Sequence, residues 1–166
     1  MFDKTRAEVS GTYVRICPED QVDIALLRNS RDRPEGRYNR LGQDALYLTP
    51  TEESARIALQ KYVSNITSRM VLVEYEIQPC MLVDLRSAQL EKYRTMVAVN
   101  WQYELSKGKE PSSWHVADLL RSHNEIGLVD PSRKEPSSWH VVLFKWNERG
   151  APTVRICSDP KPIVLT

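Results

Sequence analysis

Residues 35–48 read EGRYNRLGQDALYL, and this stretch carries most of the information about the fold. Its glycines bracket four consecutive polar side chains, from Arg37 through Tyr38 and Asn39 to Arg40, and a short apolar run with Tyr47 follows. A turn needs glycine and at most an asparagine, so two arginines and a tyrosine exceed what the turn requires. The excess of hydrogen-bonding groups at the mouth of a strand therefore needs an explanation beyond the turn.

Length and composition limit the kind of protein. The chain has 166 residues, of which 41% are apolar and 27% charged, as in ordinary globular domains. We therefore expect one domain over residues 1–166. The net charge of +1 produces no global field that would recruit nucleic acid or an anionic membrane. Any site for an anion must then be local.

The cysteines argue against disulfides and metal. Cys17, Cys80 and Cys157 are odd in number, far apart and not part of a CxxC pair, so we expect free thiols in a reducing cytoplasm. No histidine has a second ligand at metal spacing, and we predict no metal site. The N-terminal residues lack the apolar region of a signal peptide, and no apolar stretch is long enough to span a membrane.

Hydrophobic patterning predicts both strands and helices. Strands are expected at 12–17, 45–48, 70–77, 80–85, 126–129, 139–146 and 152–157, and helices at 49–62, 87–106 and 113–122. The elements do not alternate strictly, which favours an α+β fold over a doubly wound sheet.

Local signals place the element boundaries. Thr49 suits a helix N-cap, with Pro50 at the first helical position and Glu52 closing a capping box. A serine cap is expected for the helix at 113–122. Gln78 and Pro79 predict a kink or tight turn between two strands.

One octamer occurs twice. KEPSSWHV stands at 109–116 and again at 134–141, once in a predicted helix and once in a predicted strand. Repeat architectures need at least three equivalent units, so we interpret the duplication as local and without structural symmetry.

For each residue whose chemistry suits a functional site, a purely structural explanation also exists. Arg15 lies in a predicted strand, either facing solvent or reaching a carboxylate or phosphate as a planar fork. Arg37 follows Gly36, which permits close approach of a ligand, whereas Asn39 suits a turn. Tyr47 alternates with two leucines and faces either a cleft or solvent, where its ring suits stacking or plain packing.

Three further residues have strong structural explanations. Ser132 lies in an Asp-Pro-Ser turn, and Glu52 in a capping box, although a carboxylate at the edge of a cleft also stabilises positive charge in a transition state. Taken alone, Gln60 does not indicate a function. The sequence lacks GxSxG, a Walker loop and a dinucleotide-binding GxGxxG motif.

The order of these signals resembles the RES domain, a family named for an arginine, a glutamate and a serine. The carriers are TYVRI, GRYNRLG, ALYL, a helix with alanines, and VDPSR with an aromatic strand, over about residues 13–146. The resemblance implies a fold similar to ADP-ribosyltransferases, with a split mixed or antiparallel sheet and flanking helices around an NAD cleft.

The resemblance also implies a function. RES proteins are toxins of bacterial toxin–antitoxin pairs that cleave the nicotinamide–ribose bond of NAD+, by hydrolysis, phosphorolysis or transfer of ADP-ribose to a protein. NAD+ would be the substrate, without a metal. The implied partner is an antitoxin that blocks the cleft and carries a DNA-binding part, while direct nucleic-acid or membrane binding is not expected.

Residue roles follow from the same resemblance. Arg15 matches the first arginine, Arg37 the arginine of a GRWN-like motif with Tyr38 in place of tryptophan, Tyr47 the strand tyrosine, and Ser132 the serine. The implied catalytic residues are Arg15, Glu52, Tyr47 and Ser132, and the implied cofactor-binding residues are Arg37, Tyr38, Asn39 and Gln60.

The family glutamate is the point of departure. Aligning the helix by its alanines puts Gln60, which has no charge, where the glutamate is expected. Glu52 or Glu53 at the start of the helix are the replacements, with Glu52 favoured. The alternative is a catalytically weak RES-fold module that binds a nucleotide or an antitoxin. Which acceptor receives ADP-ribose stays open.

Overall fold

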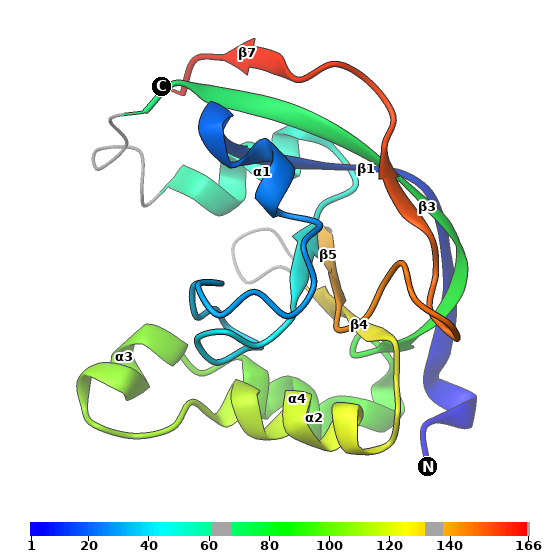
Figure 1. Ribbon diagram of the computed structural model, residues 1–166. Coiled ribbons are helices and arrows are strands. Elements are labelled where there is room, and N and C mark those ends of the chain that lie inside the picture. Colours follow the sequence, from blue (N-terminus) through cyan, green and yellow to red (C-terminus); the bar gives the residue numbers. More distant parts are fainter. Residues whose placement is uncertain (61–67, 132–137, 166) are drawn as a thin grey trace.

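Two long strands form the frame of the molecule. The computed structural model describes residues 1–60, 68–131 and 138–165. Strands β1 (Arg6–Pro18) and β3 (Met70–Asp84) pair antiparallel along almost their whole length and curve around one side of the molecule (Figure 1). This curved ribbon is the structure on which the other strands and helices are arranged.

The sheet divides on the far edge of β3. One branch adds β4 (Gly127–Pro131) in parallel, then β5 (Trp139–Leu143) and β2 (Leu46–Leu48) antiparallel, which gives the order β1-β3-β4-β5-β2. The other branch consists of β6 (Val154–Ile156) and β7 (Lys161–Ile163), which both pair with β3. A split mixed sheet with helices confirms the predicted α+β fold.

The first branch returns to its starting point. Thr49, directly after β2, exchanges two backbone hydrogen bonds with Val14 of β1, at 2.8 and 2.9 Å. The branch therefore curls until its last strand meets the first. This contact brings the middle of β1, where Arg15 lies, beside the strand that carries Tyr47.

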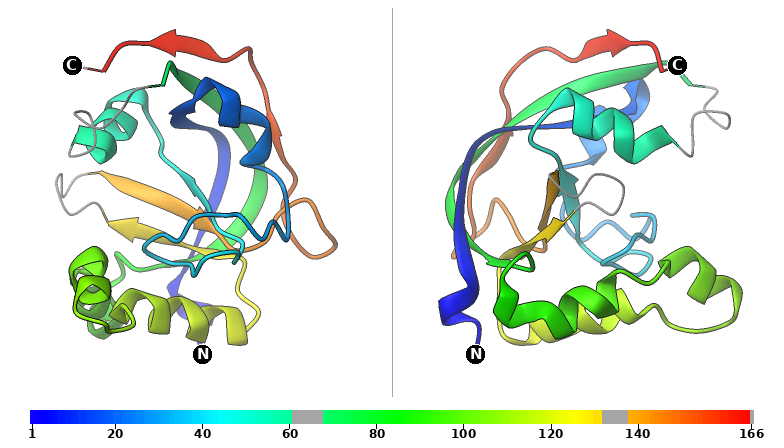
Figure 2. Two further views of the ribbon diagram at one scale, coloured as in Figure 1. Left: turned by 60° about the vertical axis from the view of Figure 1, so that its left-hand side comes forward. Right: turned by 180° about the vertical axis from the view of Figure 1, so that it is seen from behind.

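Helices cover the curved sheet at two places. They are η1 (Asp3–Thr5), η2 (Glu19–Ile24), α1 (Glu52–Leu59), η4 (Ala88–Leu90), α2 (Glu91–Val97), α3 (Trp101–Ser106) and α4 (Ser112–Ser122). Helices α2 and α4 pack against each other below β4 and β5, with α3 beside them, and α1 lies near the opposite end of the sheet (Figures 1 and 2). In the described part of the chain no helix has the length and apolarity to cross a membrane.

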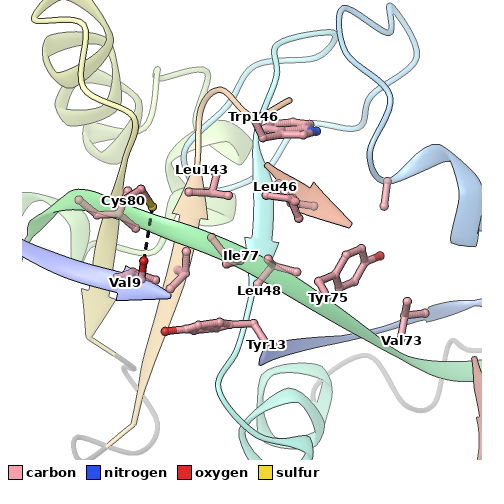
Figure 3. Close-up of a cluster of buried hydrophobic side chains, with 14 of the residues drawn as sticks. Val9, Tyr13, Leu46, Leu48, Val73, Tyr75, Ile77, Cys80, Leu143 and Trp146 are labelled. Atoms are coloured by element: carbon pink, nitrogen blue, oxygen red, sulfur yellow. Dashed lines mark hydrogen bonds between the residues drawn. The ribbon is translucent and has the colours of Figure 1, made fainter. Parts of the chain in front are cut away.

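The core has three parts that follow from strand alternation. Tyr13 of β1 points inward with Leu46, Leu48, Tyr75 and Trp146 into the largest cluster (Figure 3). Cys17 of β1 belongs to the same cluster. Val14 and Ile16, on the other face of β1, pack with Ala55 of α1. A third cluster lies between the sheet and helices α2 and α4. Apolar residues at alternate positions thus bury both faces of the sheet.

The start of α1 differs from the prediction. Thr51, not Thr49, is the N-cap: its hydroxyl accepts from the Ser54 amide at 3.1 Å, and the Ser54 hydroxyl accepts from the Thr51 amide at 3.2 Å. Glu52 closes no capping box and is the first helical residue instead. The reason is tertiary, because Thr49 is held in the bridge to β1.

The two strands predicted on either side of Gln78–Pro79 are one strand, and the irregularity there is a bulge. Strand β3 runs through both residues, and the register shifts at this point, because Gln78 and Pro79 lie opposite a single residue of β1 between Val9 and Gly11. This bulge in β3 accommodates the missing amide donor of Pro79. The Gln78 amide donates to the Thr153 carbonyl on the other side.

Other boundaries need smaller corrections. The single helix predicted at 87–106 is divided into η4, α2 and α3, because the Asn100 side chain caps a new helix by accepting from the Tyr103 amide. Helix α4 is confirmed, but Pro111 occupies its N-cap and no serine side chain caps it. Strand β5 ends at Leu143, and β7 was not predicted. All three cysteines are free, as expected.

Candidate functional site

A cavity of about 700 Å³ lies where the closing strand meets the first strand. Its walls come from β1, the loop at 33–39, β2, α1, the start of α3, and strands β4 and β5. This volume falls in the range of sites for small molecules and cofactors. Several segments far apart in the sequence thus contribute side chains to one cavity.

Arg15 contributes an unusual guanidinium to this cavity. It has the same parity on β1 as the inward-facing Tyr13 and Cys17, so the alternative of a solvent-facing arginine is wrong. Its Nε is buried without a hydrogen-bond partner, and no ion pair to it is found among the described residues. Because Arg15 is half-buried and its buried Nε lacks an acceptor, this arrangement favours an anionic ligand.

Arg37 lines the same cavity and is held by a buried carboxylate. Its Nη1 lies 3.0 Å from Oδ2 of Asp130, and the Asp130 side chain is 5% exposed. Burial lowers the pKa of Arg37, but the combined effects of Asp130 and Tyr38 leave that pKa raised. Burial raises the pKa of Asp130 despite the opposing effect of Arg37. The pair fixes the direction of the Arg37 fork.

The loop that carries Arg37 is organised by Asn39. Its amide nitrogen donates to the carbonyls of Pro34, Arg40 and Gln43, and its oxygen accepts from the Tyr47 hydroxyl at 2.6 Å. The Tyr47 hydroxyl in turn accepts from the Tyr38 amide at 2.9 Å. Asn39 is therefore committed to shaping the wall, and only the ring of Tyr47 is free for a ligand.

Gly36 allows this close packing. A Cβ at position 36 would lie 2.7 Å from the Tyr47 hydroxyl and 2.8 Å from Oδ1 of Asn39. Side chains larger than hydrogen therefore cannot be accommodated without moving the loop. The Tyr38 ring is packed beneath the loop at 1% exposure, and burial raises its pKa well above the ordinary value.

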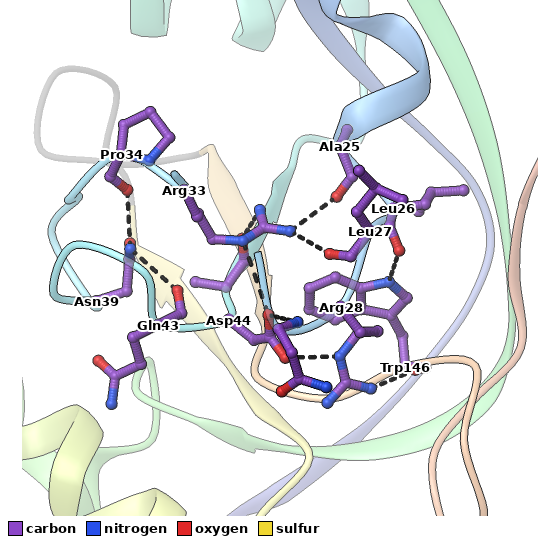
Figure 4. Close-up of polar contacts among 12 residues, drawn as sticks. Ala25, Leu26, Leu27, Arg28, Arg33, Pro34, Asn39, Gln43, Asp44 and Trp146 are labelled. Carbon is purple, nitrogen blue, oxygen red and sulfur yellow. Dashed lines mark hydrogen bonds and ion pairs between the residues drawn. The ribbon is translucent and has the colours of Figure 1, made fainter. Parts of the chain in front are cut away.

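The base of the loop is attached by a second arginine. Arg33 donates to the carbonyls of Ala25, Leu27 and Ala45, and its guanidinium lies 5.4 Å from the centre of the Trp146 ring (Figure 4). Burial lowers the pKa of Arg33, against the charge of Asp44. Unlike Arg15, Arg33 forms its hydrogen bonds with carbonyl groups of the protein itself.

Helix α4 holds the tip of the loop. The Ser113 hydroxyl donates to the Arg37 carbonyl, and the Trp114 indole nitrogen donates to the Gly36 carbonyl at 2.8 Å. Arg121, about two helical turns further along α4, donates to the carbonyls of Tyr38 and Asp44, and its guanidinium lies 4.1 Å from the centre of the Phe144 ring. Burial lowers the pKa of Arg121 to about 10. The first copy of the octamer thus anchors the backbone around Arg37.

The structure brings together five of the eight predicted site residues. Arg15, Arg37, Tyr38, Asn39 and Tyr47 all line the cavity. The other three are Glu52, Gln60 and Ser132.

These three residues do not join that group. Glu52 is directed to the surface, where its carboxylate pairs with Arg56 at 2.9 Å, and it does not line the cavity. Gln60 is exposed at the C-cap of α1 and is likewise absent from the cavity wall. Ser132 lies outside the described residues. The helix predicted to carry the family carboxylate thus presents apolar residues, such as Ile57 and Ala58, to the cavity.

Several wall residues were missed by sequence reasoning, and two of them bear on the chemistry. Asp130 lies in the VDPSR segment, which was interpreted only through its serine, and His140 lies in the second octamer copy. A signal existed for both: an acidic residue at a strand end and a histidine within a strand are unusual in otherwise apolar runs. Their proximity came only from the pairing of β4 with β5.

The charge of the wall limits what it can bind. Three arginines face two acidic residues, Glu35 and Asp130, around the cavity. An excess of guanidinium groups suits a phosphate or carboxylate ligand. No group of acidic, histidine or cysteine side chains that could hold a metal is found among the residues the structure describes.

Comparisons with known proteins agree with this geometry. The fold and cavity define an α+β protein in which a split mixed sheet and flanking helices surround a cationic, ligand-sized cleft. A family model described as RES domain matches residues 13–165, and the chain belongs to the RES domain family.

Solved structures give the same fold. A chain of the crystal structure of the M. tuberculosis MbcT–MbcA toxin–antitoxin complex matches with a TM-score of 0.65, over 95% of this chain and 86% of that chain, at 14% sequence identity. The comparison with curated proteins found no match.

Proposed function

We propose that the protein is the toxin of a bacterial toxin–antitoxin pair and consumes NAD+ in the cytoplasm. It breaks the bond between nicotinamide and ribose and passes ADP-ribose to a host protein, to water or to phosphate. Its membership of the RES domain family and its likeness to a chain of a toxin–antitoxin complex support this proposal.

One observation carries the proposal most strongly. Arg15 and Arg37, from segments 22 positions apart (37 − 15), line one cavity beside the ring of Tyr47. Arg15 has no acidic partner within the described residues, and Arg37 is aimed by Asp130. Two guanidinium groups beside an aromatic ring suit the diphosphate and the flat nicotinamide of NAD+.

The reaction requires positive charge at the diphosphate and negative charge near the ribose. The nicotinamide–ribose bond breaks through a centre with oxocarbenium character, and nicotinamide leaves as a neutral molecule. The protein must hold the diphosphate with cations and supply negative charge near the ribose. Since neither Glu52 nor Gln60 lines the cavity, the acidic residues on its described wall, Glu35 and Asp130, are the candidates for that negative charge.

The proposal is tested by nicotinamide release from NAD+. Arg37→Ala should lower the rate by about a hundredfold or more, as expected for loss of one charged group in transition-state binding. Arg40→Ala is the matched control, because Arg40 stands in the same motif but pairs with Asp118 and Glu110 away from the cavity. Equal loss in both variants, or no loss in Arg37→Ala, would contradict the proposal.

The acceptor is identified by mass spectrometry of the products. Reactions are run in buffer alone, with phosphate, and with cell extract. Free ADP-ribose indicates water, ADP-ribose 1-phosphate indicates phosphate, and a mass increment on a protein indicates a protein acceptor.

A second function is favoured by the positions of Glu52 and Gln60. Without a family glutamate on the cavity wall, the chain would be a RES-fold module that binds a nucleotide or an antitoxin and performs no chemistry. Calorimetric binding of NAD+ that remains intact after prolonged incubation would support this module. In either case the proposed partner is an antitoxin that covers the cavity and carries a DNA-binding part.

A further inference from the structure

We propose that His140 is the proton acceptor for the group that attacks the ribose, with Asp130 behind it as the residue that orients and supports it. This inference rests on the proposed function, because it assigns a role within the same cavity. Its grounds are the register of two neighbouring strands, the position of both residues on the cavity wall, and the chemistry of the transfer step.

Strand register places the two side chains together. His140 of β5 stands directly opposite Asp130 of β4 in an antiparallel pair. Residues opposite each other in such a pair project from the same face, with Cβ atoms about 5 Å apart. The next pair, Val129 and Val141, belongs to the opposite face and to the inner core. Asp130 and His140 therefore share the face that the cavity occupies.

Asp130 and His140 differ in how deeply their side chains are buried. Asp130 is 4% exposed, and its Oδ1 is buried without a hydrogen-bond partner. His140 is only half-buried and lines the cavity. The carboxylate thus lies deeper and the imidazole is the more accessible of the two, which is the order required for a carboxylate that supports a histidine base.

The surroundings keep the imidazole able to accept a proton. Burial lowers the pKa of His140, with Asp130 opposing this effect and Arg37 adding to it. Burial therefore favours the neutral imidazole, which is the form that accepts a proton. The other titratable groups on the cavity wall are Arg15, Arg33, Glu35, Tyr38 and Tyr47.

The step balances with a simple acceptor. The C1′–N bond of NAD+ breaks and its electron pair stays on nicotinamide, which leaves neutral. The oxygen of water, or of a hydroxyl on another acceptor, forms the new C1′–O bond. The proton of that oxygen passes to His140 and then to solvent. No oxidant or metal takes part in this step.

The octamer provides a matched pair of variants. His115 occupies the same octamer position as His140 but is exposed on α4. We expect His140→Gln to lower the turnover of NAD+ about a hundredfold, with NAD+ affinity changed less than threefold by calorimetry. We expect His115→Gln to keep the wild-type rate. A circular dichroism melt checks that both variants are folded.

The pH profile gives a readout that a purely structural role would not change. Wild-type turnover should rise with pH through a pKa below that of an ordinary histidine, and this limb should be absent in His140→Gln. Added imidazole should restore part of the rate to His140→Ala, whose shortened side chain leaves room for it.

The outcomes separate the two proposals. Wild-type turnover that persists in His140→Gln with the same pH limb would overturn the role of His140 and leave the proposed function standing. Wild-type protein that binds NAD+ without releasing nicotinamide would overturn both. Loss of the limb together with rescue by imidazole would support the assignment.

Discussion

Two arginines on the same cavity wall show how residue environment determines role. Arg15 and Arg33 both have a buried Nε without a hydrogen-bond partner. The rest of the Arg33 guanidinium donates to three carbonyls of its own loop, whereas no ion pair to Arg15 is found in the described residues. Arg33 is therefore a structural tie, and Arg15 is the residue available for an anion.

This contrast yields a prediction for two equivalent substitutions. Arg33→Met should lower the free energy of unfolding by about 2 kcal/mol or more, because buried carbonyls lose their donors. Arg15→Met should leave that free energy unchanged or raise it, because it removes a half-buried guanidinium whose Nε has no acceptor, yet weaken NAD+ binding by about a hundredfold. Denaturant unfolding and calorimetry measure both quantities. Similar unfolding losses in the two variants would contradict the assigned roles.

At the scale of elements, helix α4 acts on the cavity through its contacts with the loop. Its side chains satisfy the carbonyls of Gly36, Arg37, Tyr38 and Asp44. Buried carbonyls in a loop are costly unless they are hydrogen-bonded. The helix thus replaces the ladder hydrogen bonds that a strand would have given this segment.

Two adjacent serines test this function of α4. Ser113, 1% exposed, donates to the Arg37 carbonyl, whereas the Ser112 hydroxyl lies 3.1 Å from the Glu104 carboxylate. Ser113→Ala should cost about 1 to 2 kcal/mol of unfolding free energy and raise the KM for NAD+. Ser112→Ala should change stability by less than about 0.5 kcal/mol and leave KM unaltered. An unchanged KM in Ser113→Ala would show that α4 does not position Arg37.

At the scale of the whole molecule, the cavity results from closure of the sheet. The bridge between Val14 and Thr49 joins the last strand of one branch to the first strand. The cavity wall consequently combines titratable groups from both ends of the branch, and their protonation is coupled to folding.

The pH dependence of stability follows from this coupling. Burial lowers the pKa of His140, so the unfolded chain binds a proton more readily than the folded protein. His140 therefore contributes stability above the unfolded value of about 6.5, and this contribution is lost as pH falls from there through the folded pKa. Since one proton is involved, the slope cannot exceed about 1.4 kcal/mol per pH unit.

The measurement compares wild type with His140→Gln by denaturant unfolding between pH 7.5 and 5. The variant should lack this loss of stability, and His115→Gln should retain it. Asp130, whose pKa burial raises, contributes the opposite slope in all three proteins. Their difference therefore reports on His140. Parallel curves for wild type and His140→Gln would contradict the prediction.

Local patterns in the sequence predicted most elements but not their limits. Alternation in TYVRIC and ALYL and helical spacing at 113–122 were sufficient, because each depends on neighbours within a few residues. The N-cap of α1 was misplaced because Thr49 is taken by a strand 35 residues away. The break predicted in β3 is a bulge at Gln78–Pro79 instead, because β1 pairs with β3 on both sides of the proline.

Residue patterns were enough to predict the α+β class, and the family resemblance was enough to predict that Arg15, Arg37 and Tyr47 share a cavity with the polar loop at 36–40. Which charges meet could not be predicted from either. Arg37 and Asp130 are 93 residues apart, and strand pairing alone sets Asp130 opposite His140. Glu52, by contrast, faces Arg56 at the surface. Periodicity encodes which face a side chain takes, whereas the partner on that face depends on how distant strands pair.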